Sequence, residues 1–256
     1  MTSIHDLATT AELLVVSDFD GTLAGFNPSD IYDVPISEES LSALRTLAHL
    51  PHTTVAVLSG RHLGGLKKVC PLEAPVLFAG SHGAETSGEP SGERGPDEQQ
   101  QCALDALDAR LAEIIAWEPR TYLERKPFHR VIHVAPFVDE DPSRAREVLD
   151  AALAVEHEGV SMLEGKNIVE FSASEENKGT WIASHRESLG ATGVLFLGDD
   201  TTDETGFRIL REEDLGVKVG EGDTAATERV ADRDGVAALL SELAAGRTRW
   251  ADGLSR

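Results

Sequence analysis

The sequence predicts an α/β protein in which a domain built on a parallel sheet is interrupted by a smaller α+β domain. Towards both ends of the chain, short apolar runs alternate with helix-like patterns, a rhythm typical of parallel strands joined by helices. In the middle of the chain, the order changes to helix, two strands, helix, two strands. We therefore expect the larger domain to comprise residues 1–86 and 173–256, and the inserted domain to comprise residues 87–172.

The first part of the larger domain contains three predicted strands. Residues 13–17 (LLVVS) form a short apolar run, as expected of a strand that is buried on both faces. Similar runs follow at residues 54–58 and 76–79. Between the first two runs, Ser37 is a suitable N-cap for a helix with apolar residues at helical spacing. These apolar residues are Leu41, Leu44 and Ala48.

The inserted domain follows a change of composition. Residues 86–95 (TSGEPSGERG) are rich in Gly, Ser, Pro and Glu, and we expect a linker or an exposed loop there. The first helix of the insert has an apolar face that consists of Leu104, Leu107, Leu111 and Ile114. The second helix is predicted over residues 142–155. The strands are predicted at residues 120–126, 130–135, 160–163 and 167–172.

The larger domain resumes at Lys178, which opens a helix with one face buried. That face consists of Trp181, Ile182, His185 and Leu189. Strands are predicted at residues 194–197 and 216–219, with a helix over residues 203–211 between them. A last helix over residues 234–245 is expected to direct Val236, Leu239, Leu240 and Leu243 inward. Residues 247–256 are expected to fray.

Composition limits the classes of partner. The chain has 45 acidic and 23 basic side chains and a formal net charge of −22. This charge argues against binding to nucleic acid or to an anionic membrane surface, because both would be repelled. The N-terminal residues lack the basic region of a signal peptide, and no apolar run approaches the roughly 18 residues that span a bilayer. Cys70 and Cys102 are expected to be reduced thiols, as in a cytoplasmic protein.

Polar side chains follow the predicted parallel strands where each strand ends. In open α/β sheets, ligands bind at the carboxyl ends of the strands. The run DFDGT follows the first strand, SGR the second, GSHGAE the third, and GDDTTDE the strand at 194–197. Lys178, which opens the helix after the inserted domain, is expected to reach the same edge. The side chains expected to converge there are Asp18, Asp20, Ser59, Arg61, His82, Glu85, Lys178, Asp199, Asp200 and Asp203.

So many acids on one rim would repel one another unless a cation joins them. Mg²⁺ prefers carboxylate and carbonyl oxygens and keeps waters that a phosphate can replace. Lys178 and Ser59 would complete a cradle for phosphate oxygens, which suits phosphoryl transfer. Other roles stay open for several residues: Ser59 could cap a helix, Arg61 could join loops through a salt bridge, and His82 and Glu85 could serve the loop structure.

These motifs resemble those of a known enzyme superfamily. DFDGTL, SGR, the lysine of ENKG and GDDTTDE are similar to the four motifs of the haloacid-dehalogenase-like (HAD) phosphatases, which have a Rossmann-like core and an inserted cap. GSHGAE, LERK and EGKNIVEF resemble one branch, the trehalose-6-phosphate phosphatases. The resemblance runs from about Leu14 to Gly222. It implies hydrolysis of trehalose 6-phosphate in trehalose biosynthesis, with Mg²⁺ as cofactor.

The resemblance also implies a role for each acid on the rim. Asp18 would be the nucleophile that forms an aspartyl-phosphate, and Asp20 the general acid and base. Asp18, the backbone carbonyl of Asp20, and Asp199 would hold Mg²⁺. Asp200 or Asp203 would not bind the metal directly but would position the groups that do.

Four further residues would contact the substrate in the larger domain, by the same resemblance. Ser59 and Lys178 would bind the transferring phosphoryl group. Arg61 and His82 would bind the substrate. Gly21 would let the chain turn close to the phosphate.

The inserted domain offers a second group of polar residues. Side chains two apart on a strand share a face, so Glu124 and Lys126 should point the same way, away from Leu123. Glu170 should point away from its apolar neighbours, Val169 and Phe171. The three charges can therefore share the open face of one sheet. The resemblance implies that these residues bind and recognise the disaccharide.

Two other functions are compatible with parts of this pattern. A phosphatase of the same superfamily could act on another sugar phosphate, such as sucrose 6-phosphate. A non-catalytic regulatory subunit could bind a sugar phosphate or stabilise a trehalose-phosphate synthase, although it would not need both Asp18 and Asp20. Functional coupling to such a synthase is also expected for the enzyme itself.

Overall fold

The computed structural model describes residues 2–27, 30, 32–88 and 95–254. The chain divides into two compact units, Met1–Glu89 with Glu176–Arg256, and Pro90–Glu175. Most of the expected linker, residues 89–94, lies outside the described residues. Thr86, which we expected in that linker, is instead part of a short strand and pairs with Ala79.

The larger unit contains a seven-stranded sheet in the order β11-β10-β9-β1-β2-β3-β4. All pairs are parallel except β3 with β4. The strands are β1 (Leu13–Ser17), β2 (Thr53–Leu58), β3 (Leu77–Gly80), β4 (Glu85–Thr86), β9 (Gly193–Gly198), β10 (Leu215–Val219) and β11 (Glu228–Val230). The predicted α/β class and the mostly parallel sheet are therefore confirmed.

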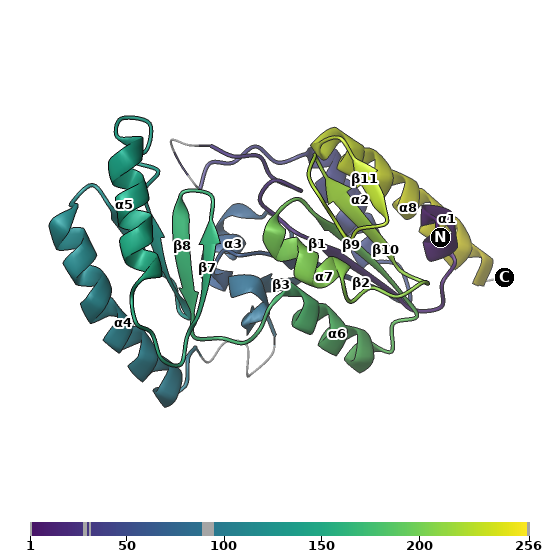
Figure 1. Ribbon diagram of the computed structural model, residues 1–256. Helices are drawn as coiled ribbons and strands as arrows, with labels where there is room; N and C mark the ends of the chain where they lie inside the picture. Colours follow the sequence, from purple (N-terminus) through teal and green to yellow (C-terminus); the bar gives the residue numbers. More distant parts are fainter. Residues whose placement is uncertain (1, 28–29, 31, 89–94, 255–256) are drawn as a thin grey trace. The chain divides into compact units, whose positions relative to one another are not determined.

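Helices cover both faces of this sheet, which explains the near-continuous apolar run of its central strand. They are α1 (Ile4–Ala8), α2 (Glu38–Ala48), α3 (Leu63–Val69), α6 (Lys178–Leu189), α7 (Glu204–Phe207) and α8 (Arg233–Leu254). Leu13 and Val15 of β1 pack in a core with α2 and α8, whereas Leu14 and Val16 pack with α6 and α7. Figure 1 shows these two groups of helices on opposite sides of the sheet.

The structure corrects three expectations for the helices of this unit. The helix predicted over residues 203–211 is present but much shorter: it is limited to α7 (Glu204–Phe207), which follows a 3₁₀ turn (Thr201–Asp203). Leu189, expected to be buried, lies at the end of α6 and is 40% exposed. Residues 247–254 do not fray, because α8 continues to Leu254. Arg247 fixes this last part: it is fully buried and donates hydrogen bonds to the carbonyl oxygens of Thr10 and His52.

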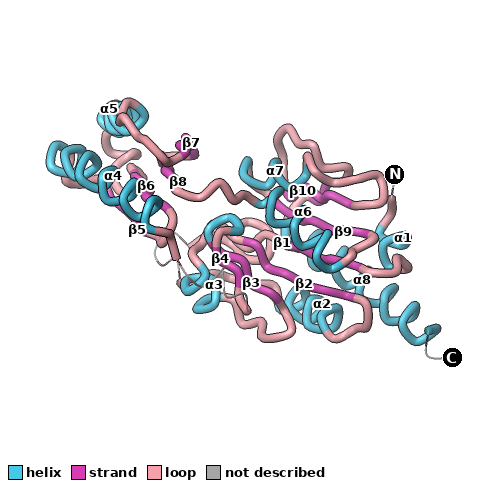
Figure 2. The backbone as a smooth tube through the Cα atoms, turned by 90° about the horizontal axis from the view of Figure 1, so that it is seen from below, coloured by secondary structure: helices cyan, strands magenta, loops and turns pink. Residues whose placement is uncertain are grey.

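The smaller unit is an antiparallel sheet with two helices on one face. The strand order is β5-β6-β8-β7. The elements are α4 (Glu98–Trp117), β5 (Tyr122–Arg125), β6 (His129–His133), α5 (Pro142–Leu153), β7 (Ser161–Gly165) and β8 (Ile168–Ser172). Figure 2 shows α4 and α5 on the same side of the sheet, where they share its apolar core. The predicted order of helix, two strands, helix, two strands is confirmed.

The apolar core of the smaller unit fixes which face of the sheet stays open. Leu123, Ile132, Val169 and Phe171 pack against residues of α4 and α5. Because neighbouring side chains on a strand point to opposite faces, residues such as Glu124 and Glu170 lie on the other face. In the part of the chain that the structure describes, no helix combines the length and hydrophobicity needed to cross a bilayer.

Candidate active site

The register of the central strands brings the predicted motifs to one edge of the larger sheet. Ser17 at the end of β1 pairs with Val57 of β2 and with Leu197 of β9. The backbone N–H of Asp18 donates to the carbonyl oxygen of Leu197 at 2.9 Å. The segments that follow β1, β2 and β9 therefore start side by side at the carboxyl edge of the sheet, as the sequence predicts.

A buried cluster of two carboxylates and one ammonium group lies at this edge. The Lys178 Nζ is 2.6 Å from Oδ1 of Asp18 and 2.7 Å from Oδ1 of Asp203. All three residues are at most 4% exposed. Buried ionised groups are tolerated only when they are paired and hydrogen-bonded, and a cluster so far from solvent indicates a function for the charges.

Local structure explains why these side chains meet. Asn177 caps α6 and accepts hydrogen bonds from the backbone N–H groups of Gly179 and Thr180, which places Lys178 in the first turn. Asp203 uses its second oxygen, Oδ2, to accept from the backbone N–H groups of Asp199 and Asp200, at 2.9 and 2.8 Å. Asp203 therefore joins Lys178 to the loop that carries Asp199.

Burial and an excess of negative charge both raise the pKa values of the carboxyl groups of Asp18 in the cluster and of the neighbouring Asp199. Burial raises the pKa of Asp18 well above its usual range, and the charges of Asp203 and Asp199 add to this effect against the opposing ammonium of Lys178. Burial and the charge of Asp203 likewise raise the pKa of Asp199 to about 6. Burial favours a neutral Lys178, but Asp18 and Asp203 outweigh it and hold the lysine pKa above its usual value. One ammonium is too little positive charge for three carboxyl groups.

The donor set of this cluster fits a hard divalent cation. One carboxylate oxygen each from Asp18, Asp199 and Asp203 lies within 4.8 Å of the others. Asp203 already accepts from Lys178 and from two backbone N–H groups, so Asp18 and Asp199 are the side chains better suited to bind a metal. Between the two residues predicted to support the metal from behind, these contacts favour Asp203. Asp200 instead accepts from the backbone N–H of Thr201.

The turn after β1 brings the backbone close to Asp199. Gly21 has a φ of +85°, and a Cβ added there would lie 2.1 Å from Oδ2 of Asp199. Only glycine fits both the conformation and the space. The Thr22 hydroxyl donates to Oδ1 of Asp199 at 3.2 Å. The DFDGT segment and the GDD segment are therefore held together by direct contact.

Asp20 lies in a two-pronged ion pair with Arg61. The Nε and one terminal nitrogen of Arg61 each donate to a different oxygen of Asp20, both at 2.7 Å. The two side chains are 16% and 26% exposed. This contact confirms the salt bridge between loops that was one of the two roles considered for Arg61. The sequence did not indicate that its partner would be Asp20.

Ser59 and His82 lie on two loops that are bonded to each other. The backbone N–H of His82 donates to the carbonyl oxygen of Ser59, and that of Ser81 to the carbonyl oxygen of Arg61. The Ser59 hydroxyl accepts from the backbone N–H of Arg61, whereas the N-cap of α3 is His62, so Ser59 is not that cap. A Cβ at Gly60 would lie 2.6 Å from the ring of His82, which places this histidine directly against the SGR loop.

Two residues outside the predicted catalytic and binding sets support these loops. Glu85 is buried and accepts from the backbone N–H of Leu63 and, at 2.5 Å, from the hydroxyl of Ser81. The alternative that Glu85 orients the loop is thus confirmed. Lys218, near the end of β10, donates to the carbonyl oxygen of Asp199 and so supports the loop that carries Asp199. A lysine inside an apolar strand run (LGVKV) was the available signal, because a buried ammonium needs a partner.

The structure also brings together the three charged residues predicted on the smaller unit. The Lys126 Nζ lies 3.4 Å from Oε1 of Glu170 and 4.0 Å from Oε2 of Glu124. Burial opposes ionisation of Glu124, but hydrogen bonding to His133 and the charge of Lys126 outweigh it and lower the glutamate pKa. The shared face that we inferred from strand alternation is confirmed.

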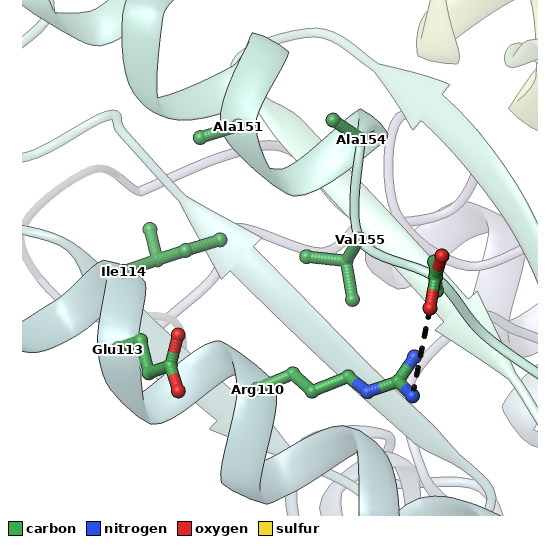
Figure 3. A pocket seen from close by; sticks show the side chains of 7 residues that line it. Arg110, Glu113, Ile114, Ala151, Ala154 and Val155 are labelled. Atoms are coloured by element: carbon green, nitrogen blue, oxygen red, sulfur yellow. Dashed lines mark ion pairs between the residues drawn. The ribbon is translucent and has the colours of Figure 1, made fainter.

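A hollow of about 340 Å³ also opens in the smaller unit, beside α4 and α5 (Figure 3). Arg110, Glu113 and Ile114 of α4 line it on one side, and an ion pair of 4.0 Å joins Arg110 to Glu156. No predicted site residue lines this hollow. The predicted site residues of the larger unit gather instead at the carboxyl edge of its sheet.

Comparisons with known proteins consistently identify similarity to trehalose-phosphatases. Residues 16–235 match the family model described as trehalose-phosphatase. The trehalose-6-phosphate phosphatase of Escherichia coli is 31% identical over 224 residues, which cover 84% of this chain and 80% of that protein. A bifunctional trehalose-6-phosphate synthase/phosphatase of Thermoproteus tenax is 30% identical over 93% of this chain. This chain spans only 33% of the length of the bifunctional protein.

Solved structures share the fold. The C-terminal domain of the Candida albicans trehalose-6-phosphate phosphatase superimposes with a TM-score of 0.74 at 20% identity. The match covers 94% of this chain and 96% of that one. At this level of identity the likeness concerns the fold, and it extends over both units of the chain.

Proposed function

Since the chain belongs to the trehalose-phosphatase family, we propose that it is a Mg²⁺-dependent phosphatase that hydrolyses trehalose 6-phosphate to trehalose and phosphate. The observation that carries this proposal is the buried cluster in which Lys178 lies between Asp18 and Asp203, with Asp199 close enough to share a cation with Asp18. Such a cluster supplies a nucleophile and the charge neutralisation that phosphoryl transfer requires.

In the proposed reaction, a carboxylate oxygen of Asp18 attacks phosphorus and the bond between phosphorus and the sugar oxygen breaks. Asp20 donates a proton to that departing oxygen, so trehalose leaves as the neutral alcohol. Asp20 then removes a proton from water, which attacks the aspartyl-phosphate, releases phosphate and regenerates the Asp18 carboxylate. Lys178 and Ser59 bind the phosphoryl oxygens, and Arg61 and His82 complete the binding loops.

Asp18, Asp199 and the backbone carbonyl of Asp20 would hold Mg²⁺, with Asp203 fixing the loop behind them. When bound, this ion would neutralise negative charge on the phosphate. The raised pKa of Asp18 and that of Asp199, about 6, support this assignment, because a cation at this place would offset the burial and the repulsion that raise them.

The smaller unit would act as the cap that selects the sugar. Glu124, Lys126 and Glu170 form a group that is largely withdrawn from solvent yet carries two negative charges and one positive charge. Such a group can donate to and accept from the many hydroxyls of a disaccharide. We assign these residues to substrate recognition within the proposed function.

The reaction would belong to trehalose biosynthesis, where a synthase supplies the phosphorylated disaccharide. The T. tenax relative, named as a bifunctional synthase/phosphatase, supports functional coupling of the two activities. Cys70 and Cys102 are both free thiols, which supports a reducing compartment such as the cytoplasm.

The test is phosphate release from a panel of sugar phosphates, including trehalose 6-phosphate, sucrose 6-phosphate and glucose 6-phosphate. We expect trehalose 6-phosphate to have the highest kcat/KM, with EDTA abolishing the activity and Mg²⁺ restoring it. A preference for another sugar phosphate would support a different substrate. Absence of turnover with every substrate in the presence of Mg²⁺ would support a regulatory subunit instead.

The cap assignment is tested separately with para-nitrophenyl phosphate, a small substrate without hydroxyl groups to recognise. Lys126→Ala and Glu170→Ala should each lower kcat/KM for trehalose 6-phosphate by about 10- to 150-fold, the cost of one charged hydrogen bond. Turnover of the aryl phosphate should fall much less. Equal losses on both substrates would mean that these residues only maintain the fold of the smaller unit.

A further inference from the structure

Beside the charged group of the smaller unit, two rings occupy the same open face of the sheet. Tyr122 of β5 shares this face with Glu124, two residues further along the strand. His133 of β6 is its direct cross-strand partner in the register. The ring centroids of Tyr122 and His133 are 5.4 Å apart and the ring planes are inclined by 41°, so the two rings are neighbours in a tilted arrangement.

The rings are joined to the charged group by a hydrogen bond. The His133 Nε2 lies 3.1 Å from Oε2 of Glu124, and an ionised carboxylate can only accept, so this nitrogen carries the proton. Glu124 is in turn 4.0 Å from the ammonium of Lys126. One connected row thus leads from Tyr122 through His133 and Glu124 to Lys126.

The exposure of these side chains differs in a way that suits a binding surface. The charged side chains are less exposed, at 12% for Lys126, 10% for Glu170 and 27% for Glu124, whereas Tyr122 is 55% exposed. A single exposed tyrosine needs no explanation. Here, however, the exposed ring lies next to a histidine that is also hydrogen-bonded to Glu124, a carboxylate assigned to substrate recognition.

The chemistry of this surface complements that of the charged group. A pyranose ring presents hydroxyl groups around its edge and C–H groups on its faces. Carboxylates and an ammonium group can bind the hydroxyls, but the C–H faces need an apolar surface, which the flat rings of Tyr122 and His133 supply. Ligand sites commonly combine such an apolar lining with a few fixed polar groups.

We propose that Tyr122 and His133 form a sugar-stacking platform that covers an apolar ring face of the disaccharide while Glu124, Lys126 and Glu170 bind its hydroxyls. This inference rests on the proposed function and extends it to two residues that determine specificity. His133 has a second effect in this arrangement, because its N–H holds Glu124 in place.

The test compares variants that keep a ring with variants that remove it. Tyr122→Ala should lower kcat/KM for trehalose 6-phosphate roughly tenfold, whereas Tyr122→Phe should stay close to wild type because the ring and not the hydroxyl binds the sugar. His133→Ala should lose more than His133→Phe, which keeps a ring but not the N–H donor. Turnover of para-nitrophenyl phosphate should stay within about twofold for all four variants.

Matched controls and a folding measurement make the outcome decisive. Trp117→Ala removes an exposed aromatic ring of the same unit that lies at the end of α4, away from this sheet face, and should leave both substrates unaffected. Melting temperatures identify any variant that is simply unstable. Wild-type kcat/KM in Tyr122→Ala, or equal losses on both substrates with unchanged stability, would overturn the platform.

A failure of the proposed function would look different. The wild-type protein would then prefer another sugar phosphate to trehalose 6-phosphate, while its turnover of the aryl phosphate persisted. In that case the same four variants, assayed with the preferred sugar phosphate, decide whether the two rings contact sugar. Losses confined to that substrate would support the platform, and losses on neither substrate would overturn it.

Discussion

Arg61 donates two hydrogen bonds to Asp20, one to each carboxylate oxygen, both at 2.7 Å. A guanidinium group in this geometry fixes the plane of the carboxylate as well as its position. Asp20 is the proposed proton donor and acceptor, so its orientation towards the sugar oxygen decides the rate of proton transfer. Arg61, in the SGR loop, is therefore expected to affect the rate of proton transfer by orienting Asp20, in the DFDGT loop.

Arg61→Lys should reduce kcat for trehalose 6-phosphate by about 10- to 150-fold, because lysine cannot supply the two-pronged grip and one charged hydrogen bond is lost. Steady-state kinetics check this, and guanidinium ion should restore part of the rate in Arg61→Ala. A rise in KM with unchanged kcat would instead mean that Arg61 mainly binds substrate. Arg146→Lys, which alters a similar but exposed pair with Asp150, is the matched control.

The affinity for Mg²⁺ should depend on pH in a defined direction. The metal requires ionised ligands, and the pKa of Asp199 is about 6, with that of Asp18 also raised. As the pH falls below about 6, each competing proton should weaken Mg²⁺ binding by roughly tenfold per pH unit. Mg²⁺ titrations of activity between pH 5 and 8 measure this slope. An apparent affinity that is constant over that range would remove these carboxylates from the metal site.

The same raised pKa predicts how Asp199 affects stability without metal. A carboxyl group with a pKa of about 6 in the folded state and 3.8 otherwise binds more protons when folded. The favourable contribution of Asp199 to the free energy of unfolding is therefore complete below pH 4 and is lost as the pH rises through 6. At pH 7 the loss lowers the free energy of unfolding by up to roughly 3 kcal/mol.

Asp199→Asn should therefore melt at a higher temperature than the wild type in EDTA at pH 7.5. It should also lose most of the stabilisation that Mg²⁺ gives the wild-type protein. Thermal melts at pH 5 and pH 7.5, with and without Mg²⁺, check both statements. Asp200→Asn is the neighbouring control, because Asp200 lies outside the carboxylate group suited to a metal. Equal melting temperatures for Asp199→Asn and wild type in EDTA would contradict the raised pKa.

Arg247 should be essential for stability although it lies far from the proposed chemistry. It is fully buried, burial lowers its pKa to about 10, and it binds the carbonyl oxygens of Thr10 and His52. Arg247→Met would remove these buried charged hydrogen bonds, although the His52 carbonyl would still accept from the backbone N–H of Leu13, and should cost about 2–4 kcal/mol of unfolding free energy. Urea unfolding checks this against Arg249→Met on the same helix. A cost below 0.5 kcal/mol would show that the bonds of Arg247 contribute little.

The contrast between Arg247 and Asp18 shows what the sequence could predict. Asp18 and Asp199 follow apolar strands directly, and parallel strands carry their carboxyl ends to one edge, so spacing along the chain locates them. Glu124 and Lys126 were placed on one face because alternation in a strand is strictly local. Each of these inferences needs only the residue and its near neighbours.

Residues with distant backbone partners escaped prediction. Arg247 binds carbonyl oxygens more than 190 residues away in the chain, and this contact turned an expected frayed tail into the end of α8. Lys218 binds the carbonyl oxygen of Asp199, and every residue has a carbonyl, so no side-chain pattern marks the pair. The sequence also could not predict that Arg61 pairs with Asp20, since several carboxylates were expected at the same edge of the sheet.

The most direct test of the central claim is phosphate release from trehalose 6-phosphate by the wild-type protein and by Asp18→Asn, with Mg²⁺ present. An amide cannot attack phosphorus, so we predict that the variant loses about 10⁴-fold or more in kcat while it remains folded. Asp150→Asn, a surface carboxylate of the smaller unit, should keep the wild-type rate. Wild-type turnover in Asp18→Asn would contradict the assignment of Asp18 as the nucleophile and, with it, the proposed mechanism.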